Sequence, residues 1–180
     1  MSAASCPFCV WRALAVQVRR TQAYMQVHMG STRGEQQAQE AVKARWEHYA
    51  HGADIGVRGI GRSMAEAFEE AAVALAGVIT DPSRVEAREE VMIECEAPDP
   101  EVLLVDWLNA LIYEMAVRRM ILARFRVSME GNQLHGSAWG EEVDVTRHEP
   151  AVEVKGATYT DLFVGQNSSG AWVAQCVVDV

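Results

Sequence analysis

Two apolar stripes at helical spacing, each opening at a clear helix-start signal, constrain the fold of this chain more than any other feature. Before the first stripe, Ser63 and Glu66 form an S-x-x-E capping box, and Pro82 stops the helix. Before the second, Asp99 stands as N-cap with Pro100 at the first helical position. The second stripe is broad, so its helix is expected to be buried on one side. Its apolar members are Leu103, Leu104, Trp107, Leu108, Leu111 and Met115.

The segments around these helices have the patterns of strands. Residues 53–61 form a short strand candidate that ends in glycines, and residues 91–96 alternate between apolar and polar side chains. After the second helix, two hairpins are expected, turning at residues 131–132 and 167–170. The order strand, helix, strand, helix and four strands predicts an α+β fold, in which a largely antiparallel or mixed β-sheet carries two main α-helices.

The chain of 180 residues has the length of one domain. Residues 1–45 are polar, Gln-rich and weakly periodic, which predicts a poorly ordered N-terminal extension. Residues 46–180 carry all the strong signals and are expected to form the folded domain.

Charge and motif content exclude several classes of function. Sixteen Lys and Arg residues against 25 Asp and Glu give a net charge of −9, the wrong sign for strong direct nucleic-acid binding. No apolar run is long enough to span a membrane and no leader pattern is present, so a cytoplasmic protein is expected. P-loop, HExxH and G-x-S-x-G motifs are absent, which argues against an autonomous enzyme.

Three short stretches contain candidate functional residues. Asp54 follows Gly52 and Ala53 at the start of a strand candidate, and Asp179 follows an apolar strand run just before Val180. Each acid is either the solvated end of its strand or a ligand held by a rigid element. Lys155 shares a strand face with an acidic neighbour, so it is either part of a solvated face or a functional cation.

Five separated segments of the chain resemble the archease family, in the order and spacing of that family. The resemblance covers residues 46–180, and none of its departures from the family pattern, at Gly52, Gly156 and Thr160, removes a charged residue. The segments are HGADIGVRGIGRSMAEAFEEAAVALAGVITD (51–81), LLVDWLNALIYE (103–114), GSAWGEEVD (136–144), EVKGATY (153–159) and the terminal VVDV.

The resemblance implies a specific function. Archeases are non-catalytic activators of an RtcB-type RNA ligase in tRNA splicing and RNA repair, where they promote guanylylation of the ligase and its multiple turnover. By position, it implies a divalent cation, typically calcium, on Asp54, Asp179 and Val180, and it places the functional lysine of the family at Lys155. The implied partner is the ligase, and no cofactor other than the cation is implied.

The residue types are compatible with this reading. A ligand set of oxygen atoms alone suits a hard cation such as calcium. If the first and last strands are neighbours, the two acids can meet at one end of a sheet, where their charges repel unless a cation or proton lies between them. Two other functions stay open: a modulator of another RNA-modifying enzyme such as a tRNA methyltransferase, and a small metal-dependent phosphoesterase that uses Asp54 and Asp179. A domain whose acids are merely solvated is the remaining possibility.

Overall fold

The computed structural model describes residues 42–180. Most of the extension predicted over residues 1–45 lies outside the described residues, and the first described strand begins at Arg45, next to the predicted boundary. None of the helices in the described part is long and apolar enough to cross a membrane.

The described residues form strands and helices in the predicted order, with four additions that were not predicted. These are strand β1 (Arg45–His51), the 3-10 helix η1 (Pro82–Arg84), the short helix α4 (Val145–His148) and the division of one expected strand into β6 (Gly156–Ala157) and β7 (Phe163–Gln166). The elements are β1 (Arg45–His51), β2 (Asp54–Gly61), α2 (Met64–Ile79), the 3-10 helix η1 (Pro82–Arg84), β3 (Glu89–Glu96), α3 (Pro100–Arg118), β4 (Met120–Glu130), β5 (Gln133–Glu142), α4 (Val145–His148), β6 (Gly156–Ala157), β7 (Phe163–Gln166) and β8 (Trp172–Asp179).

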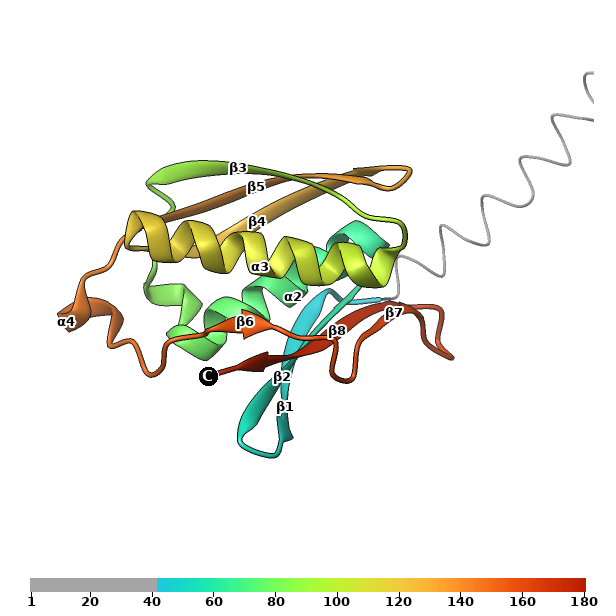
Figure 1. Cartoon of the computed structure of the whole chain (residues 1–180), viewed down its shortest axis with the longest axis horizontal. Helices are drawn as coiled ribbons and strands as arrows, with labels where there is room; N and C mark the ends of the chain where they lie inside the picture. The colour runs from blue at the N-terminus through green and yellow to red at the C-terminus, as the bar shows by residue number, and fades with distance from the viewer. Residues whose placement is uncertain (1–41) are drawn as a thin grey trace, which may run out of the picture. The chain divides into compact units, whose positions relative to one another are not determined.

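The strands form two antiparallel sheets that enclose both long helices (Figure 1). One sheet has the order β1-β2-β8-β6, with β7 also paired to β8, and the other has the order β3-β5-β4. The α+β class is confirmed, whereas the expectation of a single sheet is too simple. Helix α2 explains the difference, because it packs against β2 and β8 of one sheet and against β4 of the other, so a single sheet does not account for its buried surface.

Both helix starts are confirmed by the hydrogen bonds around them. The hydroxyl of Ser63 accepts the backbone N–H of Glu66 at 3.1 Å. The Glu66 carboxylate accepts the backbone N–H of Arg62 at 2.6 Å, so the returning half of the capping box is shifted by one residue. At α3, one carboxylate oxygen of Asp99 accepts the N–H groups of Glu101 and Val102.

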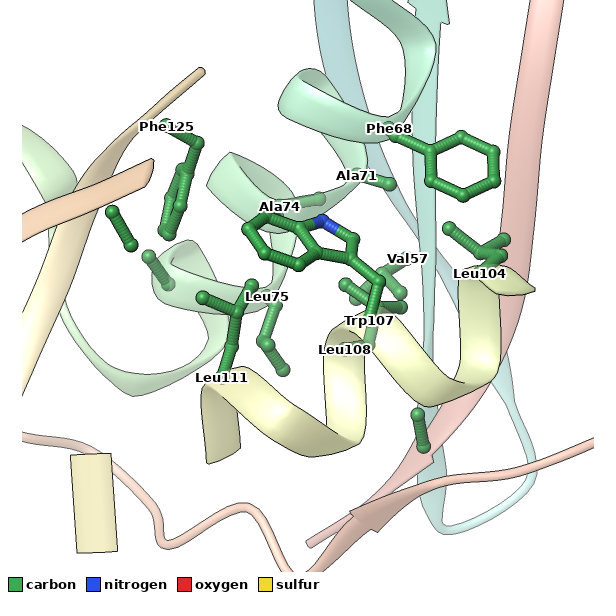
Figure 2. Close-up of a cluster of buried hydrophobic side chains, with 14 of the residues drawn as sticks. Val57, Phe68, Ala71, Ala74, Leu75, Leu104, Trp107, Leu108, Leu111 and Phe125 are labelled. Atoms are coloured by element: carbon green, nitrogen blue, oxygen red, sulfur yellow. The ribbon is translucent and has the colours of Figure 1, made fainter. Parts of the chain in front are cut away.

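Trp107 of α3 lies at the centre of the core, fully buried between the helices and the sheets (Figure 2). Its ring meets Phe125 of β4 edge to face, with ring centroids 6.4 Å apart. The indole ring also packs against Gly136 of β5, where an added Cβ would lie 2.3 Å from the ring. The second helix stripe is therefore buried as predicted, and it fixes α3 tightly in the core.

Strand β1, which was not predicted, is joined to β2 by a tight turn. His51 pairs directly with Asp54, so Gly52 and Ala53 form a two-residue hairpin turn. Gly52 has a φ of +63°, a conformation that glycine adopts without steric cost. The Gly-Ala pair before Asp54 is therefore the turn of a hairpin.

The two predicted hairpins, β4–β5 and β7–β8, are confirmed.

Candidate functional site

Asp54 and Asp179 lie at the same end of the five-stranded sheet. Strand β2 pairs antiparallel with β8, and the register places Ile55 opposite Val178. Asp54 is the first residue of β2 and Asp179 is the last residue of β8, so each directly follows this pair toward the sheet end. The condition under which the two acids can meet at one sheet end, the pairing of the strands that carry them, is therefore met.

Both acids also lie on the same face of that sheet. Gly59 faces helix α2, because a Cβ added there would lie 2.0 Å from a backbone oxygen of α2, and Val57 is buried in the same core. Side chains alternate along a strand, so Asp54 lies on the opposite, outer face. Along β8, Val178 is buried in the core and Asp179 is exposed, which places it on the outer face as well.

Lys155 reaches the same end of the sheet from the segment that leads into β6. Its ammonium group donates to the main-chain oxygen of Val180 at 2.7 Å, and its backbone N–H donates to the carbonyl oxygen of Asp179 at 2.9 Å. Strand β6 continues this pairing, with Gly156 opposite Asp179. We call Asp54, Lys155, Asp179 and Val180 together the corner; they come from three adjacent strands and their ends.

The donor atoms of the corner suit a hard cation. Two carboxylates and a main-chain oxygen are oxygen ligands of the kind that calcium binds. Within residues 42–180, no group of three or more His, Cys, Asp or Glu side chains is arranged to hold a metal. Calcium takes about six to eight oxygen ligands, so water or a partner would have to supply most of the coordination.

A layer of polar and aromatic side chains covers the outer face beside the corner. The Tyr49 ring lies flat over Gly56, where an added Cβ would be 2.2 Å from the ring, and the guanidinium of Arg58 lies 4.8 Å from the centre of that ring. Arg58 also donates to the side chain of Gln175 at 2.7 Å. Burial is the main cause that raises the pKa of Tyr49, and the nearby Asp161 adds to it. These contacts give the strands that carry Asp54 and Asp179 a well-packed outer surface.

Asn109 of α3 was not among the predicted site residues. Its side-chain amide donates to the carbonyl oxygen of Ala157 at 3.1 Å and accepts the N–H of Ala157 at 2.9 Å. The sequence contains a signal for it, a single amide within the apolar run Leu108 to Ile112. Buried or half-buried amides are seldom left without partners, so such a residue points to a backbone that needs hydrogen bonds.

A second polar cluster surrounds the buried carboxylate of Glu141. Arg147 and Arg88 lie 2.6 and 3.2 Å from one of its oxygens. The other oxygen accepts the backbone N–H of Glu86 and lies 3.2 Å from Nε2 of the fully buried His148. The Arg147 hydrogen bond is the main cause that lowers the pKa of Glu141 to about 2. This cluster fixes α4 to β5.

These features define a small α+β domain in which two antiparallel sheets enclose two helices, and two acids and a lysine meet at one sheet end. Residues 46–180 match the Archease protein family (MTH1598/TM1083). The archease of Pyrococcus furiosus is 41% identical over 140 residues, which cover 76% of this chain and 99% of that protein. The chain belongs to the archease family.

The comparison with solved structures finds a similar fold in an archaeal protein. The solution structure of Methanobacterium thermoautotrophicum protein 1598 has a TM-score of 0.65 and 33% identity, covering 75% of this chain and 98% of that one. A crystal structure from Thermotoga maritima, described as "an archease, possible chaperone", has a TM-score of 0.48 and 20% identity, covering 74% and 96%.

Proposed function

We propose that this chain is a non-catalytic activator of an RtcB-type RNA ligase in tRNA splicing or RNA repair, acting in the cytoplasm. It promotes guanylylation of the active-site histidine of the ligase and the multiple turnover of that enzyme. A divalent cation, calcium, is held by Asp54, Asp179 and the main-chain oxygen of Val180, and Lys155 acts on the partner. Membership in the archease family supports the kind of activity, and the meeting of these residues at the corner is the observation that carries the proposal.

The electrostatics of the corner support a bound cation. Two carboxylates on one face at one end of a sheet repel each other, and positive charge between them removes that cost. The Val180 oxygen, which accepts the Lys155 ammonium at 2.7 Å, is a further oxygen donor at this sheet end. When bound, a divalent cation supplies charge that can neutralise the acids and polarise a phosphate oxygen of the partner's nucleotide.

The small number of protein ligands at the corner also supports the proposal that the bound cation acts on the ligase. Because the corner offers few protein ligands, a cation held there would leave room for phosphate oxygens as further ligands. The net charge of −9 favours approach to a basic groove, such as one that binds RNA. Asp179 and Lys155 are exposed, so the corner is accessible to a large partner.

A guanylylation assay tests this proposal. The cognate ligase is incubated with labelled GTP, with and without the full chain, and formation of the ligase–GMP adduct is followed over time. Asp54→Ala, Asp179→Ala and Lys155→Ala are expected to lose stimulation while keeping the melting temperature of the parent within a few degrees.

Two matched controls remove the same charges elsewhere. Glu90→Ala removes an exposed carboxylate of β3, and Lys43→Ala removes the other lysine of the chain, which is also exposed. Both controls are expected to stimulate like the parent. Full stimulation by Asp54→Ala would reject the proposal. Release of phosphate from a phosphate ester by this chain alone would favour the metal-dependent phosphoesterase instead.

A further inference from the structure

The position of Lys155 depends on a strand that is too short to hold its own register. Strand β6 has two residues and lies at the edge of the five-stranded sheet, so only β8 pairs with it. Next to it, the backbone N–H groups of Lys155 and Thr158 each donate to β8 at 2.9 Å. An isolated pairing this short is marginal in water, because few hydrogen bonds oppose the loss of chain entropy.

Asn109 occupies the open side of this edge strand. A primary amide carries one acceptor oxygen and an NH2 donor group, the same functions that a peptide group of a neighbouring strand would present. The Asn109 amide donates to the carbonyl oxygen of Ala157 and accepts its N–H. Its side chain therefore makes the two hydrogen bonds that a neighbouring strand would make on the open side of β6. The backbone of β6 is thus held from both sides, by β8 and by α3.

The helix that carries Asn109 is a firm support. Trp107, Leu108 and Leu111 surround it in the sequence, and all three are fully buried. Helix α3 can therefore shift little without disturbing the core, and the amide transfers that rigidity to Ala157. Lys155 precedes Ala157 by two residues, so its Cα is fixed by the same two contacts.

We infer that Asn109 is a positioning residue, whose side-chain amide holds β6 in register and thereby places the amine of Lys155 at the main-chain oxygen of Val180. The inference rests on the proposed function only for the importance of Lys155 to the ligase. The hydrogen bonding itself can be tested on this chain alone.

Selective labelling makes the first test direct. The chain has two lysines, Lys43 and Lys155, so 15N-lysine labelling gives two backbone amide signals in an NMR spectrum. The Lys155 amide reports on the pairing of the β6 segment with β8, and the Lys43 amide serves as an internal reference. Hydrogen exchange of both amides is measured in the full chain and in its variants.

Asn109→Leu keeps a similar size and removes both hydrogen bonds, whereas Asn109→Asp keeps the acceptor and loses the donor. Asn109→Leu is expected to speed exchange at Lys155 by about tenfold or more, relative to Lys43, because two hydrogen bonds no longer oppose local opening. Asn109→Asp is expected to show a smaller increase, and it also serves as the informative variant if Asn109→Leu does not fold.

Asp99→Ala is the matched control, because it destabilises the same helix at its N-cap without contacting β6. It is expected to leave the ratio of the two exchange rates unchanged. An unchanged ratio in both Asn109 variants would overturn the inference, and so would an equal change in Asp99→Ala, since loss of helix stability alone would then explain the effect.

The ligase assay then separates this inference from the proposed function. Asn109→Leu is expected to lower the maximal stimulation of guanylylation about tenfold, while the concentration that gives half of the maximum stays within about twofold. If Lys155→Ala stimulates fully, the proposed function fails, and the exchange data still decide whether Asn109 places Lys155. If Lys155→Ala is inactive and Asn109→Leu stimulates fully, the positioning role of Asn109 is rejected and the proposed function is retained.

Discussion

The contact between Trp107 and Gly136 predicts a strong energetic coupling across the core. A Cβ added at Gly136 would lie 2.3 and 2.5 Å from two carbons of the indole ring, whereas carbon atoms in contact are about 3.5–4.0 Å apart. Trp107 is fully buried, so the ring has no free space into which it can move. The substitution Gly136→Ala therefore has to displace either the ring or strand β5.

The expected cost follows from two opposing effects. Overpacking of a close-packed core costs about 1–3 kcal/mol, and the rigid ring places this contact in the upper half of that range. Replacing glycine by alanine restricts the unfolded chain and returns about 0.4–1 kcal/mol, because Gly136 has no positive φ that alanine would strain. The net loss in the free energy of unfolding is therefore about 1–2.5 kcal/mol.

A double-mutant cycle tests this reasoning. Trp107→Phe removes the ring atoms nearest to Gly136, together with an indole N–H that has no hydrogen-bond partner in the described part of the chain. Urea unfolding of the parent, both single variants and the double variant gives the four free energies. We expect the double variant to be more stable than the sum of the single losses by about 0.5–3 kcal/mol. Additivity within about 0.3 kcal/mol would refute the packing explanation.

Two further predictions concern pH and calcium. The folded-state pKa of Glu141 is about 2, below the unfolded value of about 4.3, so its stabilising effect is complete above that value and is lost as the pH falls toward 2. Urea unfolding between pH 2 and 5 should show a weaker pH dependence in Glu141→Gln, and an unchanged dependence would show that other carboxylates account for it. Calcium at 100 times its dissociation constant should raise the free energy of unfolding by about 2.7 kcal/mol. A calcium-dependent melting shift should be lost in Asp54→Asn and Asp179→Asn, and its persistence in both would place the cation elsewhere.

Local signals in the sequence were sufficient for the long helices and the hairpins. A capping box, an N-cap with Pro100 and a glycine turn each act over a few residues, and the structure confirms the boundaries that they predict. Strand β1 lacks such a signal, because its inward-facing residues are not aliphatic. Trp46 and His48 face α2, and the His48 ring makes a 2.7 Å hydrogen bond to the carbonyl oxygen of Ala74. A pattern that counts apolar residues cannot identify a strand of this kind.

The meeting of Asp54 and Asp179 was predicted from two chain segments that have no local relation to each other. The pairing of β2 with β8 was stated as a condition, and the observed register meets it. The support of Lys155 could not be predicted, because Asn109 and Ala157 are 48 positions apart and nothing in either segment indicates the other. The division into two sheets likewise depends on how both helices are covered, which is a property of the whole fold.

In the corner, the acid Asp179 and the amine of Lys155 are held in position by different interactions. Ala174, Cys176 and Val178 of β8 are fully buried, so a slip of one residue would turn all three outward and move Asp179 to the inner face. The position of Asp179 is therefore as stable as the core, and a substitution that moves it should unfold the domain. Lys155 lies beside a two-residue edge strand, and its position can change while the core stays intact. The amine is thus the adjustable member of the corner, and Asn109 is the side chain that sets how far it can move.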